Sequence, residues 1–176
     1  MNNRLNGFSI KSSGNMKNES MKFQQQFGEV VKPWIANLAK EFGIDITGYK
    51  HKITGDFKRH VMKQHGNSAQ EALRGNIVVT EADLNAIDNV MNNPDIAAIG
   101  IYRHKEPRIV LVKNSQHGCI LIEEVLSGNR NKALNAKTFW IMKYPVTAEK
   151  LKNILESAGG YEKIKIAATT DANSAL

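Results

Sequence analysis

The sequence has a single cysteine, no long apolar run and no glycine-rich phosphate-binding motif. Because Cys119 is alone among 176 residues, an intramolecular disulfide framework and a cysteine-based zinc site are excluded. No stretch approaches the roughly 18 consecutive apolar residues of a transmembrane helix, so we expect no membrane contact. Residues 1–20 also lack the apolar core of a signal peptide, and we therefore expect a cytoplasmic protein.

Basic residues outnumber acidic ones, with 24 Lys and Arg against 17 Asp and Glu and a net charge of +7. A basic chain without membrane features favours a polyanionic partner. The cations concentrate in residues 50–65 and 103–143, and the first stretch also holds His51, His60 and His65. Histidines among cations are typical of a phosphate site, although such clusters also occur on ordinary solvated surfaces.

Composition and periodicity divide the chain into four parts. Residues 1–20 are polar and predict a disordered tail, and residues 21–43 predict a helical lead-in because apolar side chains recur every three or four positions. Residues 44–166 form the main domain, and residues 167–176 are expected to be a loose tail.

Within the main domain, predicted helices precede predicted strands. Thr54 as an N-cap and Gly66 as a stop predict a helix over 56–65, and Ser68 with Glu71 predicts a capping box for one further turn. Further helices are expected at about 80–92 and 147–158, and strands at 96–103, 108–113, 118–126 and 137–143. Short links favour antiparallel pairing. The expected fold is α+β, with N-terminal helices packed on a small antiparallel sheet of about four strands, and a C-terminal helix.

Two histidines lie near the end of the helix predicted over 56–65. Phe57, Val61 and His65 are spaced by four residues, so His65 lies at the edge of the apolar stripe. His60 lies about 140° around the helix from His65. The pair indicates a functional site, and the alternative is that a histidine near a helix C-terminus only caps carbonyl groups. The spacing does not fit a helical metal site, so no metal is expected.

Polar side chains also interrupt the predicted strands. Glu123 and Glu124 are adjacent and point to opposite faces, so one of them lies on a packing or cleft face, where it could act as a general base or orient a histidine. The alternative is a charge that protects an edge strand from aggregation. Thr138 follows Lys137, and a hydroxyl beside an ammonium suits a phosphate oxygen, although threonine is also common in strands.

The available side chains limit the chemistry. The sequence has no P-loop, no GxGxxG and no GxSxG motif, so no cofactor is expected. Histidine, carboxylate, hydroxyl and cations suit metal-independent RNA cleavage, in which the 2′-OH loses a proton and attacks phosphorus while the 5′-oxygen gains one. DNA lacks the 2′-OH and would not react by this route.

Several stretches, in order, resemble the PBECR domains, the phage–barnase–EndoU–colicin–RelE-like nucleases. They are GIDITGYKHKI, HVMKQHG, RGNIVVTEADL, NNPDIAAIG, PRIVLVK, CILIEEV and KTFWIMK, and they span residues 43–143. Such domains occur at the C-terminus of phage Mu-type head proteins and in bacterial toxins. The resemblance implies a small antiparallel sheet with helices on one side and an RNase-type site on the exposed side.

The resemblance also implies site residues. They include His60 or His65, with Thr138 and Glu123. We assign His60 as general base or acid, and His65 as the second proton carrier or a structural histidine. Glu123 is favoured over Glu124 because it shares a face with neighbouring apolar positions. The candidates for phosphate binding are Arg108, Lys113 and Lys137.

The expected function is that of a metal-independent endoribonuclease acting by 2′-OH transesterification in a phage- or toxin-associated domain. RNA is the expected partner, and an acidic immunity protein or a phage partner is a candidate for the basic face. The alternative is a non-catalytic RNA-binding or phage structural module on the same fold. A cytoplasmic protein without a signal peptide is compatible with delivery by a phage or a secretion system.

Overall fold

A computed structural model describes residues 9–11, 25–126 and 131–169. The strands are β1 (Ser9–Lys11), β2 (Gln25–Val30), β3 (Lys50–Thr54), β4 (Asn76–Ile77), β5 (Ile96–Tyr102), β6 (Glu106–Ser115), β7 (Gly118–Leu126), β8 (Ala133–Met142) and β9 (Tyr161–Ala168). The helices are α1 (Pro33–Lys40), α2 (Gly55–His65), α3 (Ser68–Leu73), α4 (Glu81–Leu84), α5 (Ile87–Asn92) and α6 (Ala148–Ala158), with a 3₁₀ turn, η1 (Arg103–Lys105). None of these helices is long and apolar enough to cross a membrane.

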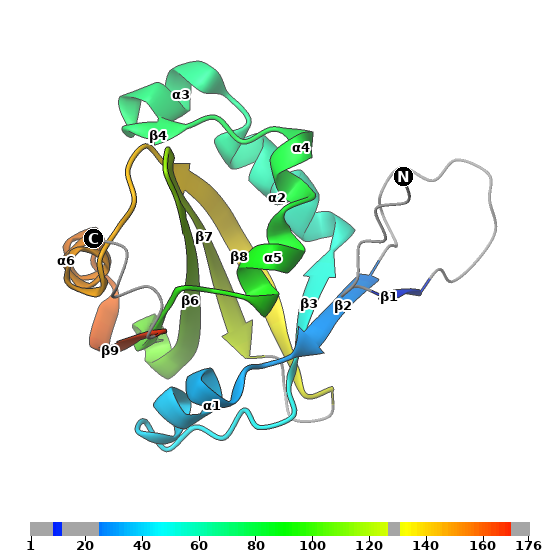
Figure 1. Cartoon of the computed structure of the whole chain (residues 1–176), viewed down its shortest axis with the longest axis vertical. Coiled ribbons are helices and arrows are strands. Elements are labelled where there is room, and N and C mark those ends of the chain that lie inside the picture. Colours follow the sequence, from blue (N-terminus) through cyan, green and yellow to red (C-terminus); the bar gives the residue numbers. More distant parts are fainter. Residues whose placement is uncertain (1–8, 12–24, 127–130, 170–176) are drawn as a thin grey trace.

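The strands form one mixed sheet (Figure 1). Eight of them follow the order β1-β2-β3-β8-β7-β6-β5-β9, and β4 pairs with β8 outside this path. β3 and β8 are parallel, whereas the other pairs are antiparallel. β3 ends at Thr54 and α2 begins at the next residue. Because β3 pairs with β8, the start of α2 lies close to β8.

The expectation of a small antiparallel sheet of about four strands is wrong. The four apolar runs do form β5 to β8, but the sheet is mixed and larger. β2 occupies part of the predicted helical lead-in, and β9 follows α6, so the predicted C-terminal helix is not the last element. β2, the sequence QQFGEV, and β3, the sequence KHKIT, are polar, and their pairing depends on partners far away in the chain.

Strand residues occur in both parts of the chain that the sequence predicts to be tails. Of the predicted disordered tail, residues 9–11 form β1, and the remainder of 1–20 lies outside the described residues. Within 21–43, α1 is the helical part. Of the predicted loose tail, Ala167 and Ala168 complete β9, and residues 170–176 lie outside the described residues.

Both faces of the sheet are covered. The core on one face joins α1, α2, α4 and α5 to strand residues such as Leu134 and Phe139. The core on the other face joins α6 to residues such as Val112 and Leu121. Figure 1 shows α6 on one side of the sheet, well away from α2, α4 and α5. Burying an apolar side chain of this size contributes about 1.5–3 kcal/mol to stability. Because a one-residue shift would expose these side chains, the register of each strand is fixed, and with it the face that each polar side chain reaches.

The ends of α2 set the position of its last residue, His65. The Thr54 hydroxyl accepts a hydrogen bond from the amide of Phe57 at 3.1 Å, and Gly66 follows the helix, as predicted. The carbonyl of His65 accepts a hydrogen bond from the amide of Val79 at 2.8 Å. The segment between β4 and α4 is therefore attached to His65, which the sequence singles out.

The predicted capping box of α3 is not formed. The side chain of Asn67, not of Ser68, caps this helix by accepting from the amide of Gln70 at 3.1 Å. Glu71 is therefore not at the capping-box position, and its carboxylate lies against His65 instead.

Candidate active site

A buried carboxylate, Glu123 on β7, forms one half of the candidate site. Its Oε1 accepts from Arg108 Nη1 at 2.7 Å, and its Oε2 accepts from the Tyr161 hydroxyl at 2.6 Å. The residue is 7% exposed and lies on the face covered in part by α6. A carboxylate removed from water needs such donors, and each oxygen keeps a further lone pair for a substrate.

Arg108 on β6 is held on three sides. Besides Glu123, its Nε donates to Glu106 Oε2 at 2.7 Å, and its guanidinium lies 3.6 Å from the ring centre of Tyr102. Burial alone would lower the pKa of Arg108, but the carboxylates of Glu106 and Glu123 raise that pKa above its ordinary value. A cation this well paired and stacked is held in one position.

Two tyrosines complete this half of the site. Burial raises the pKa of the Tyr161 hydroxyl, and the Glu123 carboxylate raises it further, so Tyr161 stays protonated and acts as a donor. The rings of Tyr102 and Tyr161 meet edge to face at 5.1 Å. Two glycines make room for them, because a Cβ on Gly100 would lie 2.5 Å from Tyr161 and a Cβ on Gly160 would lie 2.4 Å from Tyr102.

His65 and Thr138 form the other half. The Nε2 atom of His65 lies 3.4 Å from Thr138 Oγ1, and its Nδ1 atom lies 3.1 Å from Glu71 Oε2. Thr138 on β8 pairs directly with Glu123 on β7. Directly paired residues have Cβ atoms about 4.5–5.5 Å apart on one face of a sheet, so Thr138 joins the two halves.

A bulge in β8 lies opposite Glu123 and Glu124. Glu123 pairs with Thr138 and Glu124 with Ala136, which leaves Lys137 as the extra residue. Bulges re-aim side chains, and Lys137 is exposed next to Thr138. Lys137 is therefore an exposed neighbour in sequence of Thr138.

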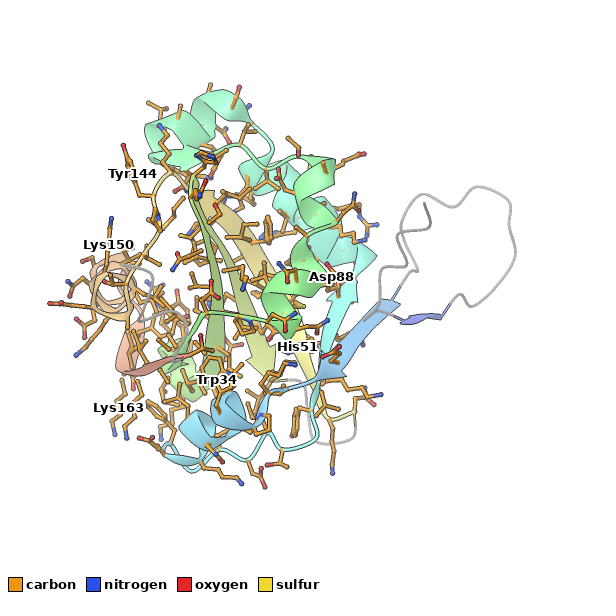
Figure 2. The ribbon with its side chains drawn as sticks, in the orientation of Figure 1. Trp34, His51, Asp88, Tyr144, Lys150 and Lys163 are labelled. Atoms are coloured by element: carbon orange, nitrogen blue, oxygen red, sulfur yellow. The ribbon has the colours of Figure 1, made fainter. Side chains whose placement is uncertain are left out.

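Glu124 points to the opposite face, where it pairs with His51. The Nδ1 atom of His51 lies 2.9 Å from each carboxylate oxygen, and the two residues are 1% and 0% exposed. Figure 2 shows His51 near β3, away from Tyr144, which follows the far end of β8. This pair belongs to the core and not to the candidate site.

Two sequence candidates lie apart from the others. His60 is exposed on α2 and makes no hydrogen bond or ion pair with another residue that the structure describes. Lys113 is on the opposite face of the sheet, where its Nζ lies 2.8 Å from Asp95 Oδ1 beside a cavity of about 310 Å³ that Trp34 also lines. The structure brings together Glu123, Thr138, His65, Arg108 and Lys137.

Lys58 is a cation that the sequence analysis did not single out. It precedes His65 by two helical turns, so the two residues share a face of α2. Burial lowers the pKa of the half-buried Lys58 ammonium. A phosphate group would restore the favourable surroundings that this ammonium loses on burial.

Glu71, Tyr102 and Tyr161 were also missed as site residues. Glu71 looks like a capping residue in the sequence, and the glycines before Tyr161 look only like a helix stop. The single cysteine is not a nucleophile, because burial raises the pKa of the Cys119 thiol to about 11. In the part of the chain that the structure describes, no group of three or more His, Cys, Asp or Glu side chains could hold a metal ion.

The comparisons with known proteins supply the class. A family model described as phage-Barnase-EndoU-ColicinE5/D-RelE like nuclease3 matches residues 29–159, well over half of the chain. The protein is therefore a nuclease-family domain. It belongs to the PBECR3 family, which confirms the resemblance and extends it beyond residues 43–143 at both ends. Neither the curated proteins nor the solved structures gave a match.

Proposed function

We propose that this domain is a metal-independent endoribonuclease, phage- or toxin-associated, that cleaves RNA by attack of the 2′-OH on the adjacent phosphorus. The direct pairing of Glu123 with Thr138 supports this proposal. His65 contacts Thr138, and Arg108 contacts Glu123. A carboxylate, an imidazole, a hydroxyl and a guanidinium thus gather around one stretch of the β7–β8 ladder.

The reaction divides the proton transfers between two residues. Glu123 takes the proton from the 2′-OH as general base, and the 2′-oxygen forms a bond to phosphorus. The bond from phosphorus to the 5′-oxygen breaks, and that oxygen takes a proton from Nε2 of His65. The products are a 2′,3′-cyclic phosphate end and a 5′-OH end.

Three other side chains would stabilise the charge that develops. The Thr138 hydroxyl lies between the base and the acid and would donate to a non-bridging phosphate oxygen. The cations of Arg108 and Lys137 would oppose the added negative charge of the phosphorane. Lys58 would bind a neighbouring phosphate of the same strand.

We propose His65 rather than His60 as the proton carrier. His65 contacts Thr138 and Glu71, whereas His60 has no such contact and lies on an exposed part of α2. A general acid must lie within hydrogen-bond reach of the atom that it protonates, and only His65 is next to the Glu123–Thr138 pair.

A non-catalytic RNA-binding module is the second candidate. The observation in its favour is that Glu123 and Arg108 are already paired with each other and with Tyr161 and Glu106, as in a structural ion-pair network. Such a network would hold the fold together without any proton transfer.

The deciding experiment is incubation of the full chain with total RNA in excess EDTA, followed by analysis of the cut ends. Glu123→Gln and His65→Gln are the inactive controls. The proposal expects 2′,3′-cyclic phosphate and 5′-OH ends from the wild type, and loss of cleavage in both variants. RNA binding without cleavage would favour the second candidate, and cleavage that requires an added divalent ion would overturn the mechanism.

A further inference from the structure

Glu71 on α3 is a fully buried carboxylate whose surroundings include the candidate general acid. We infer that Glu71 is a positioning residue that fixes the tautomer and orientation of His65, so that Nε2 faces Thr138. The role in catalysis rests on the function proposed above, whereas the effect on the imidazole can be measured without any activity.

Three side chains surround the Glu71 carboxylate, which is 0% exposed: Arg74 and Asn76 donate hydrogen bonds to it, and His65 lies within ion-pair distance. Its Oε2 lies 3.1 Å from His65 Nδ1 and accepts from Asn76 Nδ2 at 3.1 Å, and its Oε1 accepts from Arg74 Nη1. Burial by itself raises the pKa of Glu71, but these hydrogen bonds together lower that pKa below its ordinary value. Glu71 is therefore a carboxylate at neutral pH.

The surrounding backbone holds this carboxylate in place. Arg74 Nη1 also donates to the carbonyl of Gln64 at 2.8 Å, and the amide of Val79 donates to the carbonyl of His65 at 2.8 Å. The residues on either side of β4 are thus attached to the last turn of α2. Because Asn67 caps α3, the Glu71 side chain is available to His65.

A carboxylate at Nδ1 has two effects on an imidazole. It binds the Nδ1 proton of the neutral ring, which leaves the lone pair on Nε2 and fixes the direction in which Nε2 points. It also stabilises the doubly protonated ring, in which Nε2 donates. A general acid at Nε2 benefits from both effects, since it must hold its proton until the 5′-oxygen leaves.

The test uses full-length ¹⁵N-labelled protein, with Glu71→Gln as the variant. Glu81→Gln is the matched control, because Glu81 is an exposed carboxylate in the first turn of α4. ¹⁵N NMR of the imidazoles, with the His65 signals assigned from His65→Gln, reports which nitrogen carries the proton. At a pH high enough for the ring to be neutral, we expect the Nδ1–H tautomer in the wild type and in Glu81→Gln, and a mixture of tautomers in Glu71→Gln.

The kinetic readout separates positioning from folding. In Glu71→Gln, kcat should fall about tenfold while KM stays within about twofold. The alkaline limb of the kcat profile should move to lower pH, because the imidazolium has lost its counter-charge. Glu71→Asp keeps the charge, and its alkaline limb should lie between those of the wild type and Glu71→Gln.

Each outcome is decisive for the inference. An unchanged His65 tautomer and an unchanged pH profile in Glu71→Gln would overturn it. If Glu71→Gln does not fold, Glu71→Asp decides, since its alkaline limb should lie below that of the wild type, and an unshifted limb would overturn the inference. If the wild type does not cleave RNA, the proposed function fails, while the NMR measurement still tests the positioning of His65.

Discussion

Two histidine–glutamate pairs in this protein differ in the surroundings of the second ring nitrogen. In His51–Glu124 both residues are buried, and Nε2 of His51 has no hydrogen-bond partner among the described residues. In His65–Glu71 the carboxylate is equally buried, but the histidine side chain is 15% exposed, and its Nε2 lies 3.4 Å from Thr138 Oγ1.

The difference shows that a buried carboxylate beside a histidine does not by itself define a functional site. His51 and Glu124 occupy strand positions that alternate into the core. Each therefore gives the other a polar partner in place of the water that folding removes. His65 ends a helix beside β8, where its Nε2 atom contacts Thr138 and can exchange a proton with a ligand. The test of this comparison is whether activity depends on one pair and stability on the other.

The largest expected effect is on cleavage. His65→Gln should lower the rate per folded molecule by about 10² to 10⁴, because it removes the proton carrier. The measurement is single-turnover cleavage of a short RNA, with thermal melting to count folded molecules. A rate within threefold of the wild type would mean that the His65 pair is as structural as the His51 pair.

The second effect is on stability. His51→Leu leaves the Glu124 carboxylate buried without a partner, which should cost about 3–5 kcal/mol in urea unfolding. Cleavage per folded molecule should be unchanged. The double variant with Glu124→Leu should recover part of the loss, because it also removes the unpaired charge. A His51→Leu protein as stable as the wild type would show that the pair contributes nothing to the fold.

The third prediction concerns how the stability of the fold depends on the charge of Glu71 in acid. The pKa of Glu71 is held below its ordinary value of 4.5, so its carboxylate stabilises the fold above that value. This contribution is lost as the pH falls through the lowered pKa. The unfolding free energies of wild type and Glu71→Gln should therefore converge as the pH falls from 4.5 through the lowered pKa. A constant difference over that range would mean that the carboxylate charge does not act through His65 and Arg74.

Part of this arrangement could be predicted from the sequence. The apolar runs of β5 to β8 are long and their links are short, so their antiparallel pairing follows from local pattern. Thr54 and Gly66 bound α2 because capping is also local. β3 could not be found in this way, since its pairing with β8 joins residues about eighty positions apart.

The residues of the candidate site likewise divide into those that local pattern predicts and those that depend on distant contacts. Glu123 and Thr138 stand out because each is polar within an apolar strand, and their pairing follows from the β7–β8 hairpin. Tyr161 could not be predicted, because its contact with Glu123 requires β9 to lie beside β5. Glu71 is only six residues from His65, but a one-residue shift of the helix cap decides whether it caps or turns toward the imidazole.

The smallest expected effect concerns His60, which the sequence favours over His65. Its side chain is exposed on α2 and has no partner among the described residues, so His60→Ala should change stability by under about 0.5 kcal/mol. Cleavage should stay within about threefold, because the ring has no contact with Thr138 or Glu123. The measurement is the same single-turnover assay, run beside His65→Gln at two salt concentrations, since a histidine that only adds positive charge would affect binding at low salt. A hundredfold loss in His60→Ala at both salt concentrations would reverse the assignment of the two histidines, and would mean that RNA approaches α2 from its exposed side.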